Sequence, residues 1–186
     1  MVRIRKVEIQ NFRSIQSLTW QPSPGLNCRI GPGDSGKTTI LDAIDLCLGA
    51  RRNLTLADTD FFGLNVNQPI HITLTLGQLP DVLKDMDAYG QYLQAFDHTT
   101  GQLQDEPIQG VETVLLLRLT VGSELEPVWS LVSLRAQALG QERNLVWKDR
   151  QLLAPARLGA YASSSLAWTR GSGRLVICSA TPNLIQ

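Results

Sequence analysis

Cysteine is scarce in this sequence, and its three copies lie far apart, at Cys28, Cys47 and Cys178. None belongs to a CxxC pair or has the Cys/His spacing of a zinc site. This excludes a disulfide framework and a structural zinc site as the basis of the fold. We expect all three to be buried thiols.

An excess of charge is also missing, because 17 basic residues balance 17 acidic ones. The composition therefore lacks the basic bias of a dedicated nucleic-acid-binding domain. No apolar run approaches the ~18 residues that a membrane span needs, and the first residues do not resemble a signal peptide. We expect a cytoplasmic protein with no membrane partner.

The sequence does contain enough apolar residues for one sizeable core, because 43% of its 186 residues are hydrophobic. The first half predicts an N-terminal hairpin, with a strand over 2–9 and a second short strand over 17–20. Alternation over 26–30 predicts a strand that leads into a glycine-rich loop. Helical spacing of apolar residues from 40 to 48 predicts a helix, with Asp42 and Asp45 opposite its apolar face and Gly49 at its end.

The second half is dominated by strand patterns. They predict strands over 70–76, 111–121 and 128–134, with a further one at 144–148. A polar stretch from 81 to 110 separates the first two of these and allows a helix near 82–96. The fold class that we expect is α/β, with a hairpin, a strand–loop–helix unit and an antiparallel β meander.

The glycine-rich loop carries the clearest chemistry, because its spacing of glycine, four residues, glycine, lysine and threonine is that of a P-loop. Glycines at these positions let successive backbone N–H groups wrap a phosphate. The alternative is a plain glycine turn before a helix. The predicted nucleotide ligands in the loop are Gly31, Pro32, Gly33, Asp34, Ser35, Gly36, Lys37, Thr38 and Thr39.

Two of these side chains have separate electrostatic tasks. Lys37 would place its ammonium between the β- and γ-phosphates of ATP, and the Thr38 hydroxyl would bind Mg²⁺. ATP and Mg²⁺ are therefore the expected cofactors. Asp34 is expected to point away from the phosphates or to meet a cation, since a carboxylate facing them would be repulsive.

The flanks of the loop resemble a known group of ATPases. The strand that ends in Asn11-Phe12-Arg13-Ser14, followed by a hairpin and then GPGDSGKTTILDAIDLCLG, resembles the heads of the RecF and SMC group in the ABC superfamily. Within it, the run 57–62 and the later strands look most like the OLD family of ATP-dependent endonucleases. The fold expected from this resemblance is an incomplete P-loop NTPase head over 1–175, followed by an atypical or truncated tail over 176–186.

The resemblance also implies partners and further site residues. Arg13 and Ser14 become candidates for contact with the nucleotide, although a turn closed by Ser14 with a solvated Arg13 is the simpler alternative. Gln78 could act as the glutamine that links Mg²⁺ to the attacking water, but loop glutamines are common. Such heads work as homodimers, and DNA would be reached through the full-length protein.

Other parts of the expected catalytic machinery are missing from this sequence. The apolar runs 114–117 and 175–178 are followed by Arg118 and by Ser179-Ala180-Thr181, and not by the carboxylates of a Walker B strand. No ABC signature can be identified, and the tripeptide at 179–181 is a chance match to a helicase motif. We expect this chain to bind ATP without hydrolysing it alone, and to be part of a longer protein.

Three functions therefore stay open on the sequence. The first is the ATP-binding portion of an OLD-type endonuclease, whose nuclease chemistry would lie outside this chain. The second is a RecF- or SMC-like head for DNA repair or chromosome handling, and the third is a non-catalytic nucleotide-binding module. A small-molecule P-loop kinase is less consistent with a hairpin before the loop.

Overall fold

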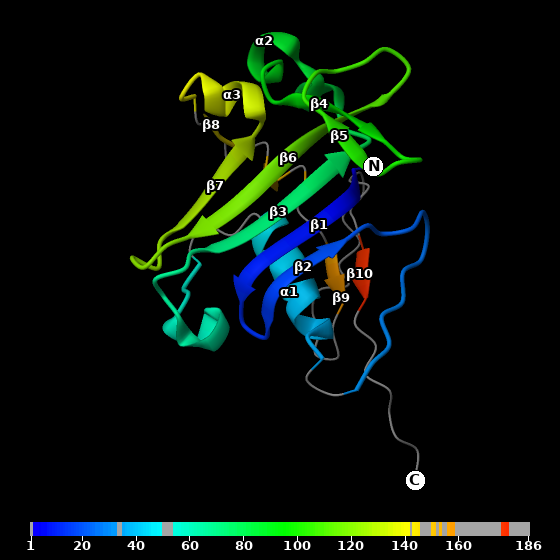
Figure 1. Cartoon of the computed structure of the whole chain (residues 1–186). Coiled ribbons are helices and arrows are strands. Elements are labelled where there is room, and N and C mark those ends of the chain that lie inside the picture. The colour runs from blue at the N-terminus through cyan, green and yellow to red at the C-terminus, as the bar shows by residue number, and fades with distance from the viewer. Residues whose placement is uncertain are drawn as a thin grey trace.

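The computed structural model describes residues 2–32, 35–49, 54–141, 143–145, 150–151, 153, 156–158 and 176–178. One large antiparallel sheet dominates this part of the chain, and one long helix packs across it (Figure 1). The strands of the sheet run in the order β2-β1-β3-β6-β4-β5, with β7 beside β6 and β8 beside β7. The predicted α/β class is confirmed.

The N-terminal hairpin forms as predicted, from β1 (Arg3–Phe12) and β2 (Ile15–Trp20). The pairing Phe12↔Ile15 leaves a two-residue turn at residues 13–14, and Asn11 and Arg13 have positive φ angles of 56° and 49°. A backbone in this region is uncommon for residues other than glycine. The turn is therefore a tightly constrained piece of the hairpin.

Three long strands make the centre of the sheet. β1 pairs with β3 (Ile70–Gly77), which in turn pairs with β6 (Glu112–Val121). The far edge of β6 is shared, since its first residues pair with β4 (Leu93–Asp97) and its later ones with β7 (Pro127–Val132). Short strands extend both branches, namely β5 (Gln102–Gln104) and β8 (Arg143–Asn144).

The long helix α1 (Lys37–Leu48) covers one face of this sheet. Cys47 is fully buried at the contact, and its Sγ lies 3.6 Å from the Ile72 carbonyl oxygen. The Trp129 indole N–H donates to the Leu46 carbonyl oxygen at 3.3 Å. Gly49 ends the helix as predicted, but Asp45 is buried and does not lie on a solvated face.

The polar stretch before β6 differs from its prediction, because no long helix spans residues 82–96. The chain forms two short helices, η3 (Asp81–Lys84) and α2 (Met86–Tyr89), and then strand β4. Gly90 stops α2, and the buried side chains from Leu93 to Phe96 complete the sheet beside β6. Burial against a strand that is distant in sequence outweighed the local helical spacing.

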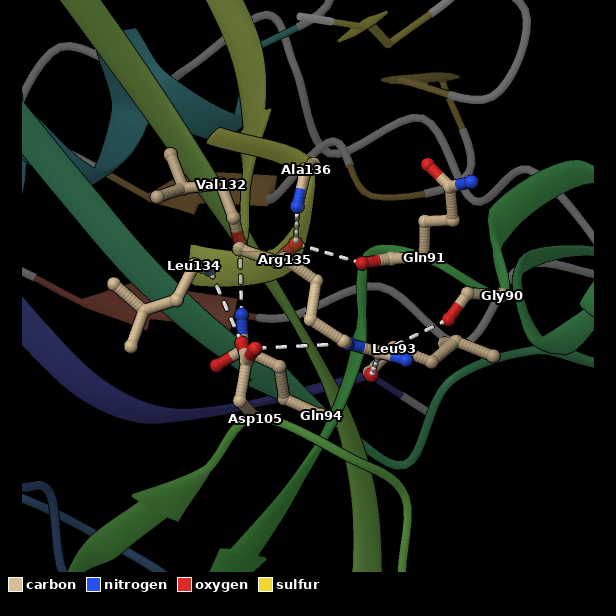
Figure 2. Close-up of polar contacts among 10 residues, drawn as sticks. Gly90, Gln91, Leu93, Gln94, Asp105, Val132, Leu134, Arg135 and Ala136 are labelled. Atoms are coloured by element: carbon tan, nitrogen blue, oxygen red, sulfur yellow. Dashed lines mark hydrogen bonds and ion pairs between the residues drawn. The ribbon is translucent and has the colours of Figure 1, made fainter. Parts of the chain in front are cut away.

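Helix α3 (Leu134–Ala138) begins where the sequence predicted the end of a strand. The Ser133 hydroxyl caps it, accepting from the Ala136 N–H at 3.0 Å and donating to the Gln91 carbonyl oxygen at 2.6 Å. Arg135 donates to the carbonyl oxygens of Gly90 and Leu93 and faces Asp105 at 3.6 Å, as Figure 2 shows. These bonds fix α3 to the segment between α2 and β4.

The last described elements are two three-residue strands, β9 (Ala156–Leu158) and β10 (Val176–Cys178), which pair in parallel. Two further short helices, η1 (Asp58–Asp60) and η2 (Phe62–Leu64), lie between α1 and β3. The strand predicted at 144–148 is present only as β8, and residues 146–149 lie outside the described part. No helix among the described residues is long and apolar enough to cross a membrane.

Candidate nucleotide-binding site

The described residues of the loop before α1 include one glycine with a left-handed backbone and one with a crowded Cβ position. Gly36 is the N-cap of α1 and has a left-handed backbone with φ 76° and ψ 10°, which favours glycine. A Cβ atom on Gly31 would lie 3.0 Å from the Ser35 hydroxyl oxygen. Gly33 and Asp34 lie outside the described residues, so the predicted orientation of Asp34 stays a prediction.

Lys37 lies folded back over the loop. Its ammonium donates to the carbonyl oxygens of Gly31 and Pro32 at 2.9 and 2.5 Å and to the Ser35 hydroxyl at 3.0 Å. The positive charge is thus held at the centre of the loop. A phosphate that entered the loop would meet this ammonium and the first N–H groups of α1.

The start of α1 is open to an anion. Among the described residues no side chain caps the N-terminus of the helix, and its first turn holds no acidic residue. The first N–H groups of such a helix lack intrahelical acceptors, and the helix dipole adds positive potential there. Thr38 is exposed in this first turn, and its predicted role as a metal ligand stays a prediction.

The turn of the hairpin lies against the same loop, as the sequence predicted for Arg13 and Ser14. The Ser14 and Thr39 hydroxyl oxygens are 3.2 Å apart, and a Cβ on Gly36 would lie 3.2 Å from the Ser14 oxygen. Figure 1 shows the β1–β2 turn beside the first turns of α1. The structure therefore brings Ser14 to the P-loop through contacts with Gly36 and Thr39.

Arg13 is engaged by two carboxylates. Its Nε donates to Asp60 at 2.8 Å, and one terminal nitrogen donates to Asp42 at 2.5 Å. Burial lowers the pKa of Arg13, but the hydrogen bonds and charges of Asp60 and Asp42 outweigh it, so the net shift is upward. No local pattern indicated this pair of acids, because residues 42 and 60 meet only after folding.

The segment that leads into the loop differs from its prediction, since residues 26–30 form no strand. Leu26 and Ile30 are 94% and 92% exposed, and none of the described strands pairs with this segment. Asn27 instead exchanges hydrogen bonds with the Ser23 backbone, and the Arg29 guanidinium lies 4.6 Å from the centre of the Trp20 ring. Local side-chain bonds of this kind compete with a sheet ladder.

The structure corrects the prediction for Cys28, and it also speaks against the alternative role of Gln78. Cys28 belongs to this same segment and is exposed, whereas Cys47 is buried as expected, and burial raises its pKa to about 12. Gln78 lies far from the loop: Gly77 pairs with Arg3 at the start of β1, and the loop lies near its end. Arg3 and Phe12 are nine residues apart along β1, which is about 30 Å, so Gln78 lies too far away to reach this loop.

The remaining site predictions concern absences. Arg118 follows the apolar run 114–117, lies within β6, which continues to Val121, and donates to the Thr73 hydroxyl at 3.0 Å. In the described ranges no group of three or more His, Cys, Asp or Glu side chains could hold a metal ion. The tripeptide 179–181 lies outside the described residues.

The comparisons with known proteins identify a family and several similar proteins. A family described as "AAA domain" matches residues 6–117, which is more than half of the sequence. The "DNA replication and repair protein RecF" of Prosthecochloris aestuarii is 48% identical over 46 residues, which cover 25% of this chain and 12% of that protein. The "Chromosome partition protein Smc" of Methanocaldococcus jannaschii is 38% identical over 64 residues, 34% of this chain and 6% of that protein.

Solved structures give a weaker likeness. The Smc head domain of Pyrococcus furiosus aligns with a TM-score of 0.48 at 18% identity, covering 81% of this chain and 32% of that one. A structure of SMC ATPases, described by its ATP-driven dimerisation and DNA-stimulated activation, gives a TM-score of 0.47 at 18% identity, over 79% and 74%. In the sequence comparisons with the RecF and Smc proteins, the aligned stretches cover about an eighth or less of the relatives' own length.

Proposed function

The chain belongs to the AAA domain family, and from that premise we propose that it binds the phosphates of ATP at the start of α1, as part of a RecF- or SMC-like ATPase head. The observation that carries the proposal is the position of Lys37, whose ammonium lies within the loop in front of an uncapped helix N-terminus. The family match and the RecF and Smc similarities support the same assignment.

In this proposal the backbone of residues 31–39 wraps the phosphates, and Gly33 and Asp34 belong to that wrap. Lys37 neutralises the β- and γ-phosphates, and the Thr38 hydroxyl takes one position on Mg²⁺. Mg²⁺ would supply charge neutralisation between the phosphates. Contacts from Arg13 and Ser14 to the nucleotide stay predictions, since in this structure Arg13 is bonded to Asp42 and Asp60.

The test is an ATP titration of the purified chain and of Lys37→Ala. Removing one ammonium from a preformed anion site should weaken ATP binding at least about 100-fold, since a charge-assisted contact to phosphate is among the strong ones. Lys84→Ala is a matched control, because Lys84 pairs with Asp81 at 3.2 Å, next to the short helix α2. Equal titrations for the wild type and Lys37→Ala would refute the assignment.

The metal role has its own variants. Thr38→Ala should reduce the effect of Mg²⁺ on ATP affinity, and Thr38→Ser should keep it, because serine retains the hydroxyl. An effect of Mg²⁺ that is the same in all three proteins would show that Thr38 is not a ligand of the metal.

We also propose that this chain binds ATP without turning it over alone, because neither apolar run that could form a Walker B strand ends in carboxylates. Hydrolysis by the purified chain that Lys37→Ala abolishes would contradict this. A nucleotide-dependent homodimer of heads is the expected assembly, and light scattering with and without ATP tests it. A cytoplasmic location is part of the same proposal.

The narrower proposal is an OLD-type endonuclease, for which the run 57–62 and the later strands are the support. In that case the coding sequence downstream would encode the acidic metal cluster of a nuclease domain. Coiled-coil heptads there would favour the SMC alternative. Finding neither, with ATP binding intact, would favour the non-catalytic nucleotide-binding module.

A further inference from the structure

The face of the large sheet that points away from α1 is polar. Side chains alternate between the two faces of a strand, so the neighbours of the buried core residues Ile72 and Leu119 lie on this second face. All but Val128 of the side chains in two adjoining rows on it are polar, and all but Thr73 are partly or fully exposed. One row holds Thr19, Glu8, Thr73, Arg118 and Ser130, and the next holds Ser17, Gln10, His71, Thr120 and Val128.

Arg118 is the charge in these rows that no carboxylate of the described residues neutralises. Its Nε donates to the hydroxyl of the buried Thr73 at 3.0 Å, which anchors the side chain on the sheet. A guanidinium has five N–H groups, and this bond uses one of them. Glu8, the acid in the same row, is bonded to Lys6 at 2.9 Å. The terminal nitrogens of Arg118 therefore have no partner in the described part of the chain.

His71 lies beside Arg118 and interacts with its charge. The Nδ1 atom of His71 and the Thr120 hydroxyl oxygen are 3.2 Å apart, and Nε2 has no partner among the described residues. Arg118 is the diagonal neighbour of His71 across β3 and β6, a position that long side chains can bridge. Burial and, secondly, the charge of Arg118 lower the pKa of His71 from 6.5. The imidazole is therefore neutral near pH 7.

We propose that Arg118, His71 and Thr120 form a second anion site, which takes a phosphate group on the open face of the sheet. Arg118 supplies the positive charge and a planar pair of N–H groups that match two phosphate oxygens. His71 supplies a further N–H, and the Thr120 hydroxyl holds the imidazole in place. The site is separate from the P-loop, which leads into α1 on the other face, and it does not depend on ATP binding there.

An anion at this place would change the proton affinity of His71. From β6 the imidazole faces Thr120 and Arg118, and from β1 it faces Gln10 with Glu8 diagonal to it. A bound phosphate would set its negative charge against the repulsion from Arg118. Since a nearby negative charge favours imidazolium, the pKa of His71 should rise when phosphate binds.

The first experiment is proton–carbon NMR of the imidazoles during a titration with inorganic phosphate at constant ionic strength. The chain has two histidines, so His98 serves as an internal control, bonded to Glu112 at 2.8 Å. The His71 signal should shift to saturation, with its midpoint on the order of 1 mM, while that of His98 should not. The proposal is overturned if His71 shows no saturable shift, or if Lys37→Ala abolishes that shift, which would place the phosphate at the P-loop.

The second experiment changes the guanidinium. Arg118→Gln should weaken phosphate binding, read at His71, at least about tenfold, because charge-assisted hydrogen bonds are lost. Arg3→Gln is the matched control, since it removes the same charge from an exposed position at the start of β1, and it should stay within about twofold of the wild type. Equal phosphate affinities in Arg118→Gln and the wild type would refute the site.

Two further readouts come from the same signals and separate a binding role from a structural one. Saturating phosphate should raise the pKa of His71 in the wild type and leave it unchanged in Arg118→Gln. A wild-type pKa that does not move would remove His71 from the site. Acetate, whose carboxylate is planar and carries one charge, should bind more weakly than phosphate, and equal affinity for the two anions would overturn the assignment to phosphate.

Discussion

The two ends of the central strands carry opposite charge arrangements. At the loop end, the Arg13 guanidinium lies between the carboxylates of Asp42 and Asp60. At the far end, the Glu112 carboxylate lies between Arg5 and His98, each at 2.8 Å, and also accepts the Gln78 backbone N–H at 3.0 Å. One end has a cation held by two acids, and the other an acid held by two basic side chains.

The two ends differ in how exposed their charged side chains are. The Arg13 side chain is 39% exposed beside an open helix terminus, whereas Glu112 and Arg5 are 16% and 13% exposed. A Cβ on Gly77 would lie only 2.6 Å from a Glu112 carboxylate oxygen, so the strand backbone closes that end. One cluster therefore lies in the hairpin turn and α1, next to the loop, and the other joins β1 and β6 to the end of β3.

The largest effect is expected from Glu112→Ala. It should lower the free energy of unfolding by about 2–3 kcal/mol, because Arg5 and the Gln78 N–H lose a charged acceptor. Urea denaturation measures this, and the exposed Glu124→Ala should stay within about 0.5 kcal/mol of the wild type. If Glu112→Ala weakened ATP binding as much as is expected of Lys37→Ala, the contrast between the two ends would fail.

A smaller effect is expected from Gly77→Ala, which tests how tightly the far end is packed. The added methyl would press on the Glu112 carboxylate and should cost about 1–2 kcal/mol of unfolding free energy. In a Glu112→Ala background the same change should cost much less, since the two sites share one contact. Gly122→Ala is the control, because no atom lies within 4 Å of its Cβ position. If Gly77→Ala cost the same unfolding free energy in the wild type and in the Glu112→Ala background, the clash would not be with Glu112.

The smallest effect is a pH dependence. Burial raises the pKa of Glu112, but the Arg5 hydrogen bond and charge, the Gln78 N–H and the charge of His98 outweigh it, so the net pKa is lowered from 4.5. The stabilisation is therefore complete above the unfolded pKa and is lost as the pH falls through the folded pKa. The stability difference between the wild type and Glu112→Gln should narrow as the pH falls below 4.5; a constant difference would contradict the shift.

Prediction from the sequence succeeded where local patterns and burial agreed. The helix α1 and the strand β3 have a periodic apolar pattern, and β6 has a continuous apolar run that is buried in the sheet. It failed at residues 26–30 and 82–96. The alternating segment 26–30 pairs with none of the described strands. The polar stretch that allowed a helix near 82–96 instead supplies β4, which pairs with β6.

For the site, the sequence by itself determined the loop, since glycine spacing and the lysine after it have a local physical reason in backbone conformation and charge. It also placed Arg13 and Ser14 near that loop through the family resemblance. Only the tertiary structure decided that Arg13 faces Asp42 and Asp60 and that Gln78 lies at the far end of the sheet. Strand register and the approach of segments distant in the chain set these contacts, and no local spacing encodes them.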